Sequence, residues 1–136
     1  MHDRALTIWL CEQLGEIAGW KWSETDSYSA SVVGVYYGRI STDTARGVGV
    51  RIYGGTDDRE TGVKTRRVQL RFRGGPSATD GADILADQAF DRFDDLFRVG
   101  VISEVVRQSF SPAGSDTNQR EERTDNYLID FDNPEG

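Results

Sequence analysis

The side chains that most often carry out chemistry are scarce in this sequence. Its one histidine, His2, lies at a chain end that we expect to fray, and its one cysteine, Cys11, lies in an apolar segment where we expect it to pack as a small hydrophobic residue. A nucleophile paired with histidine, a disulfide framework and a cysteine-based zinc site each lack a second residue. We therefore predict no catalytic residues, no metal ligands, no cofactor and no enzymatic activity.

Carboxylates are plentiful, but their surroundings do not favour catalysis. Asp57, Asp58 and Glu60 lie in a polar segment without the apolar wall that would raise a carboxyl pKa. The run Asp116-Thr117-Asn118 could bind calcium, but the EF-hand spacing and its closing glutamate are missing. The Gly-x-Gly of residues 47–49 precedes a strand rather than a helix, so it does not predict a phosphate-binding loop.

Length and composition indicate one domain over residues 1–136. The 136 residues are 37% hydrophobic, which is enough for one core without cross-links. The net charge of −7 argues against a protein that wraps nucleic acid, because such a protein needs lysine or arginine to replace phosphate counterions. No apolar run could span a membrane and no signal peptide is evident, so we expect a soluble protein made in a reducing cytoplasm.

The charge is unevenly distributed along the chain. Residues 54–75 hold 6 basic and 3 acidic residues, whereas residues 76–100 hold 2 basic and 6 acidic ones. Residues 101–136 are acidic as well, with 3 basic and 8 acidic residues. In a monomer this asymmetry would only aid solubility, but copies packed side by side could set the opposite fields against each other.

Apolar periodicity predicts the elements that must position these residues. A helical stripe covers residues 3–18, and alternation with period two predicts strands near residues 33–37, 48–53 and 68–73. We expect Trp20 and Trp22 in a turn or an extended stretch.

A second helix follows from residue 82, with Ser77 or Thr79 as its N-cap, and two more strands are predicted over residues 101–110 and 126–131. The predicted fold class is α+β. Two helices cover one face of a largely antiparallel sheet of about five strands, in the order helix, three strands, helix, two strands.

The second helix carries the clearest pattern in the chain. Its apolar side faces the core, and the opposite side carries a row of aspartates: Asp83, Asp87, Asp91 and Asp94. Like charges at i,i+4 destabilise a helix by a few tenths of a kcal/mol per pair, so this row does not stabilise the helix. Either the row is an ordinary solvated face, or the negative electrostatic field that it directs outward serves a function.

Two polar stretches, residues 54–66 and 111–122, are longer than the turns their flanking strands need. We therefore predict long loops that make contacts between subunits or rings. The candidate contact residues are Asp57, Asp58, Arg59, Lys64, Arg66, Ser115, Asp116, Asn118 and Arg120.

The chain resembles the tail terminator, or minor capsid, proteins of long-tailed bacteriophages. The resemblance rests on the N-terminal helix with Leu6, Leu10 and Leu14, on the strand 67–75 that runs into the Asp-rich helix, and on the closing pair of strands at 105–110 and 115–131. The loop 38–47 departs from the family, whose members often have proline there. The family's contacts at this loop are therefore not assigned to this chain.

The resemblance implies a structural virion protein without catalytic residues. It implies a closed ring, typically a homohexamer, that caps the tail tube in the neck of the virion and joins the tail to the head-completion or connector proteins. DNA would pass through the lumen without specific binding, no membrane would be contacted, and the acidic row could line the channel. The chain would be made in the cytoplasm of the bacterial host and would reside at the head–tail interface.

Two other functions stay open at this point. One is a different neck or tail-completion protein, which would share the ring and the lack of chemistry. The other is a small cytoplasmic enzyme or ligand-binding domain, which would need a deep apolar pocket with a few convergent polar groups.

Overall fold

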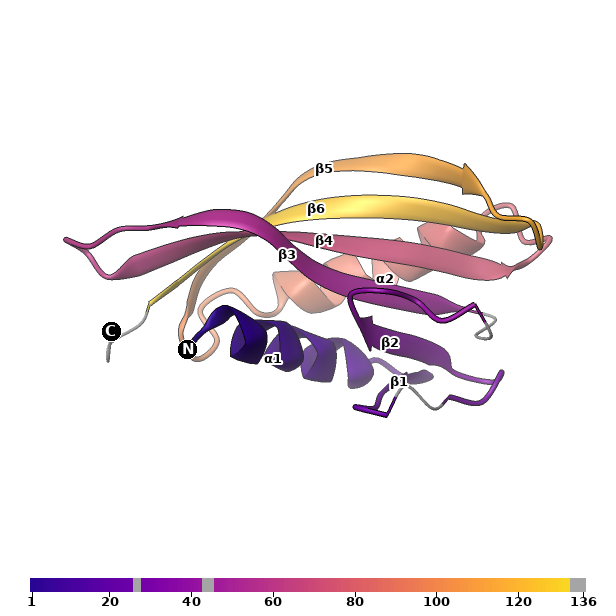
Figure 1. Cartoon of the computed structure of the whole chain (residues 1–136), viewed down its shortest axis with the longest axis horizontal. Helices are drawn as coiled ribbons and strands as arrows, with labels where there is room; N and C mark the ends of the chain where they lie inside the picture. The colour runs from indigo at the N-terminus through magenta and orange to yellow at the C-terminus, as the bar shows by residue number, and fades with distance from the viewer. Residues whose placement is uncertain (26–27, 43–45, 133–136) are drawn as a thin grey trace.

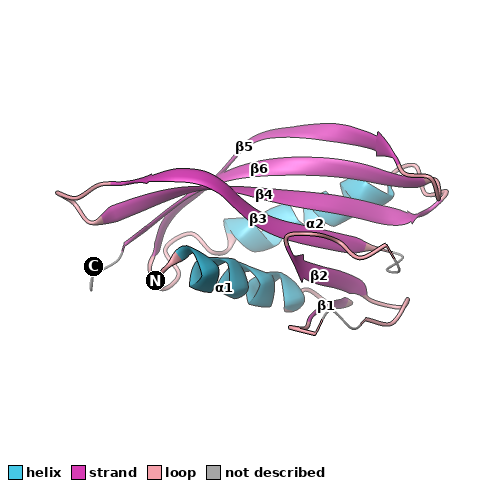
Figure 2. Cartoon of the chain, in the orientation of Figure 1, coloured by secondary structure: helices cyan, strands magenta, loops and turns pink. Residues whose placement is uncertain are grey.

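The computed structural model describes residues 1–25, 28–42 and 46–132, which form two helices and one six-stranded sheet (Figure 1). Along the chain the elements are α1 (Asp3–Gly15), β1 (Trp20–Trp22), β2 (Val33–Tyr37), β3 (Gly47–Asp57), β4 (Val63–Pro76), α2 (Gly81–Asp94), β5 (Ile102–Ser115) and β6 (Arg120–Asp132). The strands lie in the order β1-β2-β3-β4-β6-β5. Both helices pack on the same face of the sheet (Figure 2).

This arrangement confirms the predicted α+β class and adds one strand. The stretch around Trp20 and Trp22 forms β1, which pairs in parallel with β2. β2 in turn pairs in parallel with β3, and the remaining three pairings are antiparallel. Trp20 is 6% exposed, so this short strand belongs to the core.

Each helix covers one half of the sheet. α1 contacts β1, β2 and β3, and α2 contacts β4, β5 and β6. The predicted apolar stripes are the buried ones, but α1 ends at Gly15, so Ile17 and Ala18 lie in the following turn. The N-cap of α2 is Asp80 rather than Ser77 or Thr79, because residues 78–81 first form a turn in which Gly81 donates to the Ala78 carbonyl.

The two predicted long loops are wrong in extent. Most of residues 54–66 continues the strands β3 and β4, and only residues 58–62 connect them. Likewise, β5 runs to Ser115 and β6 begins at Arg120, which leaves a connection of residues 116–119. Backbone groups make the ladder, so polar strands pair as well as apolar ones. Apolar alternation is absent because the buried side chains of these ends, Arg66 and Arg120, are polar.

The parallel pair of β2 and β3 explains the glycines at residues 47–49. Residues 38–42 after β2 lie close to β3, and a Cβ atom at position 49 would lie 2.0 Å from the Gly38 carbonyl oxygen. Gly49 therefore allows a close backbone approach rather than forming a phosphate loop. Arg73 and Arg120 hold this connection, because they donate to the carbonyls of Ser41 and Thr42.

Candidate assembly surfaces

The face of the sheet opposite the helices carries arginine side chains. Strand register places Arg51 beside Gln69, and Arg67 beside Leu128, across neighbouring strands. Side chains in register point to the same face of a sheet, and Arg71 shares this face because it lies two residues from Gln69. Arg51, Arg67 and Arg71 are all exposed, and no helix within the described part of the chain covers them. We call these three residues the arginine face.

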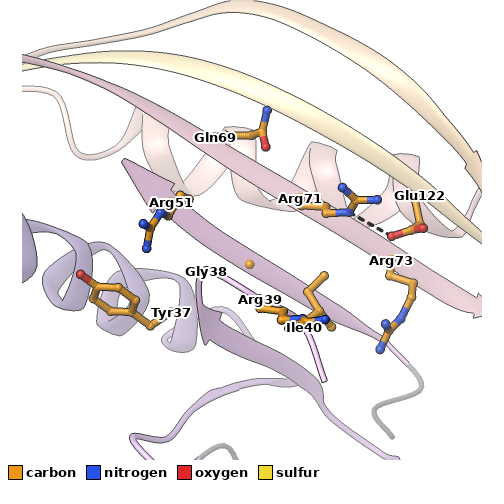
Figure 3. A pocket seen from close by; sticks show the side chains of 10 residues that line it. Tyr37, Gly38, Arg39, Ile40, Arg51, Gln69, Arg71, Arg73 and Glu122 are labelled. Atoms are coloured by element: carbon orange, nitrogen blue, oxygen red, sulfur yellow. Dashed lines mark hydrogen bonds and ion pairs between the residues drawn. The ribbon is translucent and has the colours of Figure 1, made fainter. Parts of the chain in front are cut away.

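A shallow hollow of about 600 Å³ lies on this face beside the connection that follows β2 (Figure 3). Its lining includes Tyr37, Arg39, Ile40, Arg51, Gln69, Arg71, Arg73 and Glu122. Arg71 Nε lies 3.0 Å from Glu122 Oε1, and Glu122 is the one carboxylate in the lining of this hollow. The net positive charge suits a carboxylate or a phosphate.

This hollow, which we call the arginine hollow, is not organised for catalysis. Its lining contains no serine, cysteine, histidine or lysine. Within the described ranges no group of three or more His, Cys, Asp or Glu side chains could hold a metal ion. The hollow also differs from the deep apolar pocket that a small-molecule site would need. The hollow is therefore an open surface of net positive charge.

The predicted acidic row lies on the outer surface of α2. Asp83, Asp87, Asp91 and Asp94 are all exposed, and Ile84, 50% exposed, lies among them. Asp83 Oδ1 accepts a hydrogen bond of 3.0 Å from Arg123, whereas the other three form no ion pair with any residue that the structure describes. We call these four residues, together with Ile84, the aspartate face. α2 covers one side of the sheet and the arginine face lies on the other (Figure 1).

The β3–β4 hairpin carries the first group of predicted contact residues. Its tip extends beyond α1 at one end of the molecule and exposes Asp57, Asp58 and Arg59, with Lys64 half-buried nearby (Figure 1). Asp58 accepts hydrogen bonds from the backbone of Thr61 and Glu60, which shape the turn and lower the pKa of the Asp58 carboxyl.

Arg66 differs from the rest of this group because it is 8% exposed and fully engaged within the subunit. Its Nε lies 2.6 Å from Asp3 Oδ1 in α1, and its Nη2 lies 2.7 Å from Asp57 Oδ1. The hydrogen bond from Arg66 also lowers the pKa of Asp57. Arg66 thus fastens the start of α1 to the hairpin and is not available to a partner.

The β5–β6 turn carries the second group and lies at the opposite end of the sheet (Figure 1). Ser115 and Asn118 are exposed, but Arg120 is 6% exposed and its Nε lies 2.7 Å from Asp116 Oδ2. The other oxygen of Asp116 accepts from the backbone N–H groups of Asn118 and Arg120. The calcium-like run of residues 116–118 is therefore a turn whose carboxylate already binds local donors.

A buried charged cluster beneath α2 was missed by sequence reasoning. Asp125 is fully buried; its oxygens lie 2.7 Å from Arg123 Nε and 3.4 Å from Arg107 Nη1. Arg107 lies over the Phe90 ring, and Arg123 also bonds Asp83, so the cluster ties β5 and β6 to α2. Arg123 and Asp125 carry opposite charges two residues apart, and they alternate in step with the buried residues Tyr127 and Ile129. A pattern of apolar alternation does not include them, because both are polar.

The comparison with known protein families identifies a match over most of the chain. A family model described as "Bacteriophage tail terminator protein" matches residues 14–133, which include every strand and α2. No curated protein matches the chain. No described helix is long and apolar enough to cross a membrane.

Proposed function

Because this chain belongs to the bacteriophage tail terminator family, we propose that it is a structural virion protein that caps the tail tube as a closed ring of six copies and joins the tail to the head connector. The observation that carries this proposal is the family match over residues 14–133. The protein then resides in the neck of the virion, at the head–tail interface, contacts no membrane and catalyses no reaction.

The shape of the subunit supports contacts to two different neighbours along the tail axis. The β3–β4 hairpin and the β5–β6 turn lie at opposite ends of one sheet (Figure 1). One end can contact the last ring of tail-tube protein and the other the head-completion proteins. The residues that remain for these contacts are Asp57, Asp58, Arg59, Lys64, Ser115 and Asn118, whereas Asp116 already bonds Arg120 within its own turn.

Paired strands also suit such contacts energetically. A long unstructured loop would lose conformational entropy on binding, whereas the ladders of these hairpins already order the backbone. Arg66 and Arg120, which the sequence placed among the contact residues, stabilise the two hairpins from inside the subunit. The hairpins therefore act as preformed docking elements.

The proposal is tested with purified tail tubes and the purified protein. We expect electron microscopy to show an added ring at one end of each tube, and capped tails to join heads in a completion assay. Tube ends that stay bare at micromolar protein would contradict the proposal. A protein that is monomeric in free solution would not, because a ring can depend on its partner to form.

The same experiment separates the other two candidate functions. A neck protein of a different layer would bind heads or connectors but leave tube ends unoccupied. A small-molecule enzyme or binding domain is not supported by the described surface, since its arginine hollow is open and polar.

A further inference from the structure

The arginine face and the aspartate face lie on opposite sides of one two-layered subunit. Arg51 and Arg67 form no ion pair with any described residue, and neither do Asp87 and Asp91. The core between sheet and helices separates the two sets, so they cannot neutralise each other within one subunit. Each face therefore presents uncompensated charge.

Symmetry decides how copies of this chain could use these faces. In a two-fold dimer each face would meet its own copy, and arginine would face arginine or aspartate would face aspartate. In a head-to-tail arrangement the arginine face of one copy meets the aspartate face of the next, and opposite charges pair at every boundary. Only the second arrangement can close into a ring of more than two copies.

The spacing of the charges fits such a contact. Arg67 and Arg71 are four residues apart on a strand, which places their Cα atoms roughly 13 Å apart. Asp87 and Asp94, which form no ion pair with any described residue, are seven residues apart on a helix, which gives roughly 11 Å along its axis. A helix laid along β4 would therefore bring aspartates opposite the arginines.

Each face also has an exposed apolar side chain near its charges. Ile84, 50% exposed, lies at the start of the aspartate row. Val106, 43% exposed, lies on β5 in register with Leu128 of β6, which in turn pairs with Arg67 of β4. Apolar contacts surrounded by charged groups are the usual composition of a protein interface. The free edge of β5 is a poorer candidate, because three register shifts interrupt its pairing pattern.

We propose that the arginine face binds the aspartate face of the next copy and that this contact forms the subunit boundary of the ring. The inference rests on the ring of the proposed function and names the surfaces that build it. It also replaces the channel wall predicted from the sequence for the aspartate row, since a row covered by a neighbour does not line the lumen.

The test reverses the charge of each face separately and then of both together. One variant is R51E/R67E, the second is D87K/D91K, and the third carries all four substitutions. The matched control is R4E/K21E, which changes the net charge by the same amount as the first variant at exposed positions outside both faces. Circular dichroism and thermal unfolding check that each variant folds.

Assembly is measured by sedimentation and by electron microscopy of tail tubes mixed with each protein. We expect each single-face variant to need at least a tenfold higher concentration to form rings. The variant with all four substitutions, in which opposite charges face each other again, should recover ring formation, and the control should behave like the wild type. Such recovery is expected only if the two faces contact each other between copies, because they are too far apart to meet within one subunit.

Several results would overturn the inference. Single-face variants that form rings like the wild type would show that these faces are not the boundary, even though capping itself stands. Normal rings with altered DNA ejection from D87K/D91K virions would place the row in the channel. Normal rings with altered DNA binding by R51E/R67E would make the arginine face a nucleic-acid surface. Bare tube ends with the wild type would instead contradict the proposed function.

Discussion

Arginine has two distinct roles in this protein, and burial separates them. Arg66, Arg73, Arg120 and Arg123 are each less than 10% exposed and hold elements together inside the subunit. Arg51, Arg67 and Arg71 are exposed on the open face of the sheet. The side chain is the same, but only the second set is exposed. If the arginine face binds the next copy as proposed, mutations in the first set would impair assembly by destabilising the subunit and mutations in the second set by removing the contact. Folding must therefore be measured alongside binding.

Asp125 provides the sharpest test at the residue scale. Asp125→Asn removes the charge that compensates Arg123 and Arg107 beneath α2, and breaking a buried ion pair costs about 3 kcal/mol of unfolding free energy. Urea denaturation measures the difference. The control is Asp87→Asn on the exposed surface of α2, which we expect to change stability by less than about 0.5 kcal/mol. Equal stability of the two variants would show that the cluster contributes little.

The turn at Asp116 predicts a pH dependence with a defined sign. Desolvation alone would raise the pKa of this carboxyl, but hydrogen bonds from Arg120 and Asn118 outweigh it, so the pKa lies below 3.8 in the folded protein. A lowered pKa stabilises the fold above the unfolded value of 3.8, and this contribution is lost as the pH falls through the folded value. We expect the melting temperature of Asp116→Asn to be below that of the wild type at neutral pH. The gap should narrow below pH 3.8, and a gap independent of pH would contradict the assignment.

The β5–β6 hairpin shows how an element can be ordered without adding to the core. The end of β5 from Gln108 to Ser115 is exposed throughout, yet it pairs with β6 over its length. The backbone ladder keeps this end ordered, while its side chains bury little apolar area. Its loss should therefore affect contacts more than folding.

Deletion of residues 113–119 tests this role of the β5–β6 hairpin. The deletion joins Pro112 to Arg120. It keeps the β5–β6 pairs between Pro112↔Arg123 and the core end of the two strands, so we expect a folded protein with cooperative unfolding. We also expect capping and head joining to fall at least tenfold, as counted from capped tails by electron microscopy. A matched variant replaces Ser115 and Asn118 by alanine and keeps the length of the hairpin. Normal yield from the deletion variant would mean that the hairpin is only a connector.

At the scale of the whole molecule, charge sets the relation to DNA. The net charge of −7 repels a duplex, and the arginine face offers only three exposed cations on an otherwise acidic protein. Non-specific DNA affinity depends on the number of phosphates neutralised and falls steeply with salt. In the proposed ring, weak attraction would suit passage of a genome, because tight binding would hold the duplex in place.

We therefore expect no measurable binding of the isolated protein to duplex DNA at about 0.15 M salt. Fluorescence anisotropy of a labelled duplex provides the measurement, with a basic DNA-binding domain as the positive control. Saturable binding at micromolar protein would contradict the prediction, and its loss in R51E/R67E would identify the arginine face as the cause.

The sequence by itself determined the class of the fold and both helical faces. The reason is that the spacing of apolar residues is a local property of the sequence. Ala82, Leu85 and Phe93 repeat with the helical turn, whatever the helix packs against. The family resemblance also came from the sequence, and the match over residues 14–133 confirms it. The lengths of the hairpins were not predictable from the apolar pattern, because their ends bury little apolar surface and the buried side chains there, Arg66 and Arg120, are polar.

Only the tertiary structure decided which charges are available to partners. Arg66 and Arg67 are neighbours in the chain, yet one is buried between Asp3 and Asp57 and the other lies exposed on the sheet. Adjacent residues on a strand point to opposite faces, and the partners of Arg66 come from distant parts of the chain. The opposition of the arginine and aspartate faces is likewise a product of packing, since it exists only once α2 covers the far side of the sheet.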